Sequence, residues 1–266
     1  MIATRDLLVR GLLAGLLAGV AAFFVAYAVG EPSVGAAIAL EEGGGAADHD
    51  HGTATTTTAT TTASEDHDHA TVVPRSLQST AGLATATVLA GVTLGGLVGV
   101  VSALALGRFG RLGPRSTVLL VTGLGLLVTY VVPYLAYPPN PPAVGQADTI
   151  GSRTALYFIL VAVSLIVGVT AVLVARRLAT RWGAWYATLA CAAGYGVVMA
   201  VAIAIMPDYD EVPAGFPAGV LFDFRQASLL TQLALWGGVG LVTAELAHRL
   251  TVRGRRQVRP AGLVDA

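Results

Sequence analysis

The chain has 266 residues, of which 55% are hydrophobic and 12% are charged, about half the charged fraction of an ordinary soluble domain. A water-soluble protein of this size needs a more charged surface, so most of the chain is expected to lie in lipid. The formal net charge is zero, with 16 arginines, 16 acids and no lysine. A single cysteine, Cys191, excludes a disulfide framework and a multi-cysteine metal site.

Six apolar segments are long enough to cross a bilayer as helices, because a span needs roughly 20 residues. They predict an all-α integral membrane protein with about six transmembrane helices arranged as three hairpins. The segments lie at about 8–29, 81–106, 116–136, 154–175, 183–206 and 226–248. The predicted parts are an N-terminal helix at 1–29, a loop at 30–79, a five-helix membrane core at 80–250 and an Arg-rich tail at 251–266.

The first segment has some features of a cleaved secretory signal, because Arg5 and Arg10 accompany its apolar run. The run is longer than the apolar core of a typical signal, so we expect the segment to be retained as a membrane helix. Glycines recur at every fourth position in the first two spans, which allows two helix backbones to approach closely in lipid. These glycines are Gly11, Gly15 and Gly19, and Gly91, Gly95 and Gly99.

Four of the five histidines lie within residues 48–69, in two D-H-D-H boxes separated by a threonine-rich spacer. Imidazole with carboxylate binds divalent metals such as cobalt, nickel, zinc and copper. The spacer has no hydrophobic period, so the 30–79 loop is predicted to be disordered and to capture metal with fast exchange. The alternative is a solvated polar loop. The candidate ligands are His49, His51, His67, His69, Asp48, Asp50, Asp66 and Asp68.

The arginines alternate between the two sides of the predicted membrane. Thirteen fall in the N-terminus, the 107–115 and 176–182 links and the C-terminal tail, whereas the loops between them hold Arg75, Arg153 and Arg225. Cytoplasmic segments carry the positive excess. We therefore expect a multi-pass protein of the cell membrane, with both termini in the cytoplasm and the histidine-rich loop outside.

Further oxygen donors lie in two proline-rich outward loops, where they could line a cation vestibule or be ordinary loop acids. At the opposite end of the sixth span, Glu245 and His248 share a helix face and could assist metal exit. Pro133 is expected to bend or end the third span. The candidate vestibule residues are Asn140, Asp148, Asp208, Asp210, Glu211 and Asp223.

The two proline-rich loops, within residues 133–157 and 206–236, resemble those of the CbtA family, the predicted cobalt transporter subunit. The resemblance extends from the first span to the sixth and also fits a histidine-rich first loop. The family is often described with five spans, whereas six are counted here. The positions that match the family's motifs are Pro133, Tyr137, Pro138, Asn140, Pro141, Pro142 and Gly145, and Pro207, Pro213, Gly215, Pro217 and Arg225.

The resemblance implies a subunit of a cobalt uptake system linked to cobalamin synthesis, working with CbtB, a small single-span subunit that contains histidine. No permanently bound cofactor is expected, and cobalt or nickel would be the transported or loop-bound ion. The alternative is a metal-binding or sensing membrane protein for nickel, zinc or cobalt that transports nothing.

An intramembrane enzyme is not expected, because the chain contains no H-E-x-x-H, G-x-S-x-G or Walker lysine. Any ATP hydrolysis must come from another chain. No nucleic-acid partner is expected either, since the arginines form short clusters between apolar spans.

Overall fold

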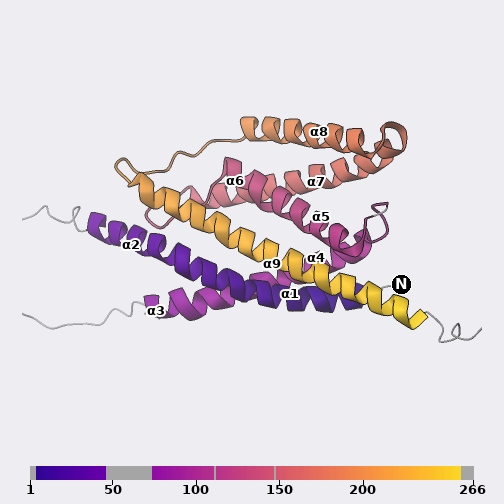
Figure 1. Cartoon of the computed structure of the whole chain (residues 1–266). Coiled ribbons are helices and arrows are strands. Elements are labelled where there is room, and N and C mark those ends of the chain that lie inside the picture. Colours follow the sequence, from indigo (N-terminus) through magenta and orange to yellow (C-terminus); the bar gives the residue numbers. More distant parts are fainter. Residues whose placement is uncertain (1–3, 46–73, 111, 147, 259–266) are drawn as a thin grey trace, which may run out of the picture.

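The computed structural model describes residues 4–45, 74–110, 112–146 and 148–258, and within these ranges every regular element is a helix (Figure 1). Six helices in this part of the chain are long and apolar enough to cross a membrane. This confirms the prediction of an all-α membrane protein with six spans. The six are Thr4–Gly43, Arg75–Ala105, Pro114–Ala136, Ile150–Trp182, Ala184–Ile205 and Ala218–Val252.

The first helix is longer than predicted. It consists of α1 (Thr4–Val25), the π-helical turn η1 (Ala26–Gly30) and α2 (Glu31–Gly45), and backbone angles at both junctions are helical. The prediction of a loop from residue 30 is therefore wrong over Glu31–Gly45. Ser33 and Ala37 of α2 are buried, and α2 packs on the last long helix, which explains why the helix continues.

The second span also begins earlier than predicted. α3 (Arg75–Leu77) and the π-helical turn η2 (Gln78–Gly82) lead directly into α4 (Leu83–Ala105). The predicted 30–79 loop is therefore wrong at its end as well. The remainder of that loop, residues 46–73, lies outside the described residues.

The third span contains a π-helical turn immediately before a proline. It consists of α5 (Pro114–Leu126), η3 (Leu127–Val131) and α6 (Val132–Ala136). Pro133 has no N–H for a helical hydrogen bond, and the N–H of Val132 bonds the carbonyl of Leu127. The helix thus passes Pro133 through a change of hydrogen-bond register and ends three residues later. Pro32 lies two residues after the end of η1, just as Pro133 lies two residues after the end of η3.

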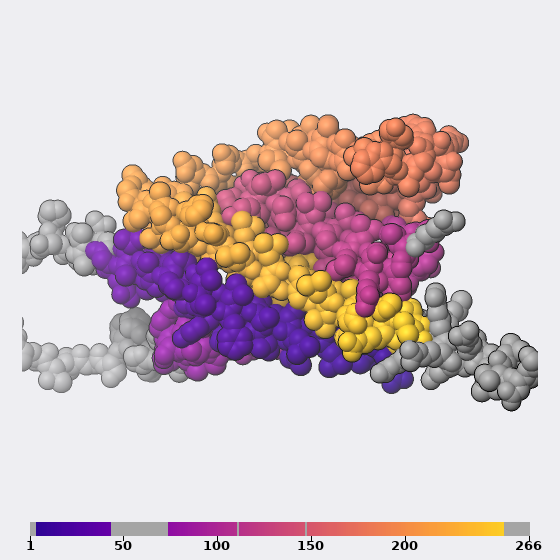
Figure 2. Space-filling view, in the orientation of Figure 1, coloured from indigo at the N-terminus to yellow at the C-terminus, as the bar shows by residue number. Residues whose placement is uncertain are grey.

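Four helices form the larger packed group: α1, α4, α5 and α9 (Ala218–Val258). Their buried core includes Leu7, Val98, Val118 and Val239. Figure 2 shows α9, in yellow, crossing the face of the molecule between the indigo N-terminal helix and the magenta α5. This group holds the sixth span against the first and the third.

The predicted glycine faces hold α1 and α4 together. A Cβ atom added at Gly11 would lie 2.1 Å from the carbonyl oxygen of Gly95, and one added at Gly15 would lie 2.0 Å from that of Gly91. No side chain fits at either position, because backbone meets backbone. The prediction that these glycines mediate helix packing is confirmed.

A second, smaller group consists of α6, α7 (Ile150–Trp182) and α8 (Ala184–Ile205), with a core around Val132, Leu160 and Met199. α8 packs chiefly on α7, whereas α9 packs on α1 and α5. The three predicted hairpins therefore describe the path of the chain but not its packing, since the fifth and sixth spans belong to different groups.

The two ends of the helix bundle differ in charge. We call the end that carries the 137–149 and 206–217 loops, Gly45 and Arg75 the acidic end, and the end with the start of α1 and the end of α9 the arginine end (Figure 1). Among the described residues, those of 31–45, 74–79, 137–153 and 206–225 include eight acids and three arginines, and the others include two acids and 11 arginines.

The last helix, α9, is longer than the bilayer is thick. α9 has 41 residues, which corresponds to about 61 Å, whereas the hydrocarbon core is about 30 Å thick. No charged residue occurs between Arg225 and Glu245, 20 positions apart on α9, so this stretch matches the membrane. α9 also remains helical to Val258, so the predicted Arg-rich tail begins as a continuation of this helix.

Candidate functional site

The two proline-rich loops meet at the acidic end and are joined by a buried carboxylate. Glu211, in the loop between α8 and α9, is only 8% exposed. One of its oxygens accepts a hydrogen bond from the Thr149 hydroxyl, and the other forms an ion pair with Nη1 of Arg153. Thr149 and Arg153 belong to the other loop and to the first turn of α7. We call these three residues the Glu211 clasp.

The clasp lowers the pKa of Glu211 below its usual value near 4.5. The hydrogen bond from Thr149 is the largest cause, and the Arg153 guanidinium acts in the same direction, while burial opposes them. The carboxylate is therefore charged at neutral pH and already paired. A metal ion could coordinate it only by displacing Arg153.

Gly145 makes the clasp possible. Its φ is +127°, a conformation that favours glycine. A Cβ atom at this position would lie 3.2 Å from Nη1 of Arg153 and 3.3 Å from Oε2 of Glu211. The family-motif glycine therefore lies directly against the ion pair, where a side chain would push it apart.

The contacts between the loops are reciprocal. Arg153, which follows the 137–149 loop, pairs with Glu211 of the 206–217 loop. Arg225, which follows the 206–217 loop on α9, donates from Nη2 to Oδ1 of Asn140 in the 137–149 loop at 3.0 Å. The Tyr137 hydroxyl also donates to the carbonyl oxygen of Pro207 at 2.8 Å. Asn140, Tyr137, Pro207 and Arg225 are positions at which the sequence resembles the CbtA motifs, and here they hold the two loops together.

The other predicted vestibule acids do not join this junction. Asp148, Asp208 and Asp210 are exposed, and none of them forms an ion pair within the described part of the chain. Asp223 is also exposed and lies on α9, where it lines a separate groove. The six candidates are therefore distributed over the acidic end, and their role in metal passage stays a prediction.

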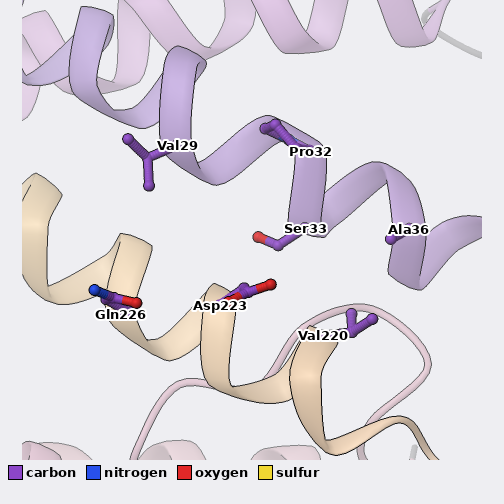
Figure 3. A pocket seen from close by; sticks show the side chains of 7 residues that line it. All are labelled: Val29, Pro32, Ser33, Ala36, Val220, Asp223 and Gln226. Atoms are coloured by element: carbon purple, nitrogen blue, oxygen red, sulfur yellow. The ribbon is translucent and has the colours of Figure 1, made fainter.

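The groove lies between the N-terminal helix and the first turns of α9. Figure 3 shows Ser33 of α2 and Asp223 of α9 facing each other across it, with Gln226 one turn further along α9. Its volume is about 230 Å³. Neither Ser33 nor Gln226 could be selected from the sequence, because no pattern predicted that helix 31–45 exists. The residues that line the groove are Val29, Pro32, Ser33, Ala36, Val220, Asp223 and Gln226.

The predicted histidine and aspartate ligands at 48–51 and 66–69 lie outside the described residues. The helices that flank them are described: α2 ends at Gly45 and α3 begins at Arg75, both at the acidic end. Arg75 forms an ion pair with Glu31 at the start of α2. This pair joins the start of α3 to the start of α2.

Elsewhere, the described residues include no group of three His, Cys, Asp or Glu side chains that could hold a metal ion. At the arginine end, Glu245 accepts hydrogen bonds from Nη2 of Arg115 at 2.6 Å and from Nε of Arg249 at 2.9 Å. Its carboxylate is thus paired with two arginines. A role for Glu245 and His248 in metal exit stays a prediction.

Inside the membrane, one hydrogen-bonded group joins η3 to α7 and α8. The hydroxyl of Ser164 donates to the carbonyl oxygen of Val128 at 2.6 Å and lies 2.7 Å from the Tyr195 hydroxyl. The Val128 carbonyl needs this partner, because the N–H of Val132 bonds Leu127 and Pro133 has no N–H. Nothing in the sequence identified Ser164, since a lone serine in an apolar span carries no pattern.

Comparison with known proteins identifies one family. The family model described as "Probable cobalt transporter subunit (CbtA)" matches residues 4–248. No curated protein and no solved structure matches the chain.

Proposed function

The chain belongs to the CbtA family of probable cobalt transporter subunits, and from this premise we propose that it is the membrane-spanning subunit that carries cobalt, or nickel, across the cell membrane. The observation that carries the proposal is the family match over residues 4–248, which begins in the first helix and ends in the sixth span. The metal ion is the cargo of this process and not a resident cofactor.

The acidic end is proposed to face the outside of the cell, with both termini in the cytoplasm. The charge distribution supports this orientation, because 13 of the 16 arginines fall in the N-terminus, the 107–115 and 176–182 links and the C-terminal segment, and cytoplasmic segments are enriched in arginine. A divalent cation outside the cell would then meet the end that carries most of the carboxylates.

Capture of the metal is proposed for the histidine-rich segment. Its four histidines, His49, His51, His67 and His69, each have aspartate neighbours, and such ligands suit cobalt and nickel. The helices that flank it, α2 and α3, end and begin at the acidic end, which also carries the loops with the other candidate ligands. Neutral imidazole is the binding form, so capture should weaken as the pH falls below about 6.5.

A second subunit is proposed to complete the transporter. The family resemblance implies a small single-span, histidine-containing chain of the CbtB type and a link to cobalamin synthesis. Two observations support a need for ligands or energy from another chain: the absence of a three-ligand cluster within the described ranges and the absence of a Walker lysine.

Uptake of radiolabelled cobalt by cells that express this chain, with and without the partner, tests the proposal. Cells with the chain and its partner should accumulate cobalt faster than cells with an empty vector. If binding of cobalt by the membranes increases while uptake does not, the chain is a capture or sensing protein and transport is wrong.

Replacement of the four loop histidines by alanine tests the capture step. The initial uptake rate should fall several-fold when cobalt is limiting and return to the wild-type rate when cobalt is in excess, because capture affects only the local concentration of metal. The matched control replaces Thr55–Thr58 of the spacer by alanine and should leave both rates unchanged. Equal rates for the histidine variant and the wild type at limiting cobalt would contradict the capture role.

A further inference from the structure

The groove between α2 and α9 is distinct from the loop junction. Asp223 and Arg225 are two positions apart on α9, so their side chains leave the helix in directions about 200° apart. Arg225 reaches Asn140 of the 137–149 loop, whereas Asp223 faces α2 (Figure 3). The groove therefore has its own set of polar groups.

Each of those polar groups contains an oxygen acceptor, and Gln226 also has an amide NH2 group. Ser33 is buried, with 6% exposure, and its hydroxyl donates to the carbonyl oxygen of Gly30 at 2.8 Å. The proton of Ser33 is thus used within its own helix, and the hydroxyl can present only lone pairs to the groove. Asp223 adds a carboxylate, and Gln226 adds an amide oxygen. No arginine or histidine lines the groove.

The charge of Asp223 is uncompensated in the described part of the chain. The carboxylates of Glu31 and Glu211, also at the acidic end, each have an arginine partner. Asp223 has no ion pair within that part. A carboxylate surrounded by neutral oxygen acceptors attracts a cation, and oxygen ligands suit hard or hydrated divalent ions.

We propose that this groove binds a hydrated divalent metal cation, with Asp223 as the charged ligand and Ser33 and Gln226 as neutral oxygen partners. A hydrated divalent ion is about 7 Å across, given metal–oxygen distances of about 2.1 Å, and the groove volume of about 230 Å³ accommodates it. Three side chains cannot fill six coordination positions, so water completes the shell. Such a site exchanges its ion rapidly.

This inference rests on the proposed function, because it makes the groove the place where the transported metal first meets the folded helices. Its ligands come from α2 and α9, which belong to the group of helices with α1, α4 and α5. The groove therefore lies at the outer end of that helix group and not at the junction of the two proline-rich loops.

The test measures Mn²⁺ binding to the full chain in lipid nanodiscs by electron paramagnetic resonance, which distinguishes free from bound Mn²⁺. The four loop histidines are replaced by alanine in every sample, so that imidazole does not contribute. Asp223→Asn should weaken binding about tenfold, because the single charged ligand is lost, and Ser33→Ala should weaken it less. The control Glu42→Gln removes an exposed charge from α2 and should have little effect.

Equal Mn²⁺ affinities for Asp223→Asn and Glu42→Gln would overturn the inference. Cobalt uptake by cells separates this result from a failure of the proposed function. If wild-type cells take up cobalt but Asp223→Asn binds Mn²⁺ normally, the groove is not a cation site and transport stands. If Asp223→Asn loses Mn²⁺ binding but wild-type cells take up no cobalt, the groove binds cations and transport is wrong.

Discussion

Glu211 is the charged side chain that the described part of the chain buries most deeply. A buried carboxylate is stable only when its partners replace the water it has lost, and here Thr149 and Arg153 do so. All three residues lie outside the membrane spans or at their start, and Thr149 and Arg153 precede Glu211 by 62 and 58 positions. Removal of one partner leaves a buried charge without a partner. The clasp should therefore contribute more to the stability of the fold than an exposed ion pair does.

Glu211→Gln should lower the melting temperature at neutral pH, and this difference from the wild type should shrink in acid. The pKa of Glu211 is lowered in the folded protein, so the stability that its charge provides is present above the unfolded value near 4.5 and is lost as the pH falls through the folded value. Melting followed by tryptophan fluorescence from about pH 6 to pH 3 measures both proteins.

Glu42→Gln provides the matched control, because Glu42 is exposed on α2. Its melting temperature should follow the wild type at every pH. A difference between Glu211→Gln and the wild type that stays constant down to the lowest pH would show that the carboxylate charge does not stabilise the fold.

At the scale of elements, the α1–α4 pair is the tightest helix contact in the molecule. Glycines from the two helices alternate along the contact, and their carbonyl oxygens lie where a Cβ atom would have to be. Without a hydrophobic driving force between helices in lipid, such close backbone packing is the main source of association. The pair therefore supports the group to which α9, and with it the groove, belongs.

Gly15→Ala should destabilise the protein by about 1–3 kcal/mol, because the added methyl group forces the two backbones apart. The control is Gly194→Ala on α8, where an added Cβ atom meets nothing within 4 Å and alanine is the better helix former. Thermal unfolding in nanodiscs compares the two. The same melting temperature for both variants would contradict the packing role of Gly15.

The glycine contact was predictable because its pattern is local: two triplets with a period of four residues. The apolar pattern likewise identified all six spans, since charged residues occur only near their ends. The extension of the first helix was not predictable, because Pro32 and the glycines around it are typical of a loop. Only the burial of Ser33 and Ala37 against another helix outweighs that tendency.

The contacts within the candidate site were not predictable from the sequence either. Sequence motifs selected Asn140, Glu211 and Arg225 individually, but no spacing indicates that Arg153 pairs with Glu211 or that Arg225 pairs with Asn140. These contacts join residues 58 and 85 positions apart. They depend on how α7, α8 and α9 are placed, which a single sequence does not reveal.

At the scale of the whole molecule, charge is divided almost completely between the two ends. All three arginines of the acidic end are held in contacts, with Glu31, Glu211 and Asn140, while Asp148, Asp208, Asp210 and Asp223 are exposed. The resulting negative potential raises the local concentration of cations, and dissolved salt screens it.

Cobalt uptake at limiting cobalt should therefore slow as salt is added, by about threefold between roughly 20 and 200 mM. The double variant Asp208→Asn/Asp210→Asn should reduce this salt dependence. The matched double variant Asp6→Asn/Asp265→Asn, which removes one acid near each end of the sequence, should not. Initial rates of radiolabelled cobalt uptake at several salt concentrations measure the effect, and salt-independent uptake would exclude electrostatic attraction at the acidic end.

The smaller helix group, with α7 and α8, is inserted in the sequence between helices of the larger group. Residues 132–205 run without interruption through α6, α7 and α8, so the smaller group is a continuous insert within the larger one, whose helices come before and after it. The chain passes between the groups only at η3 and through the 206–217 loop. The Glu211 clasp ties the second of these passages to the start of α7. The hydrogen bond from Arg225 of α9 to Asn140 joins the larger group to the insert directly.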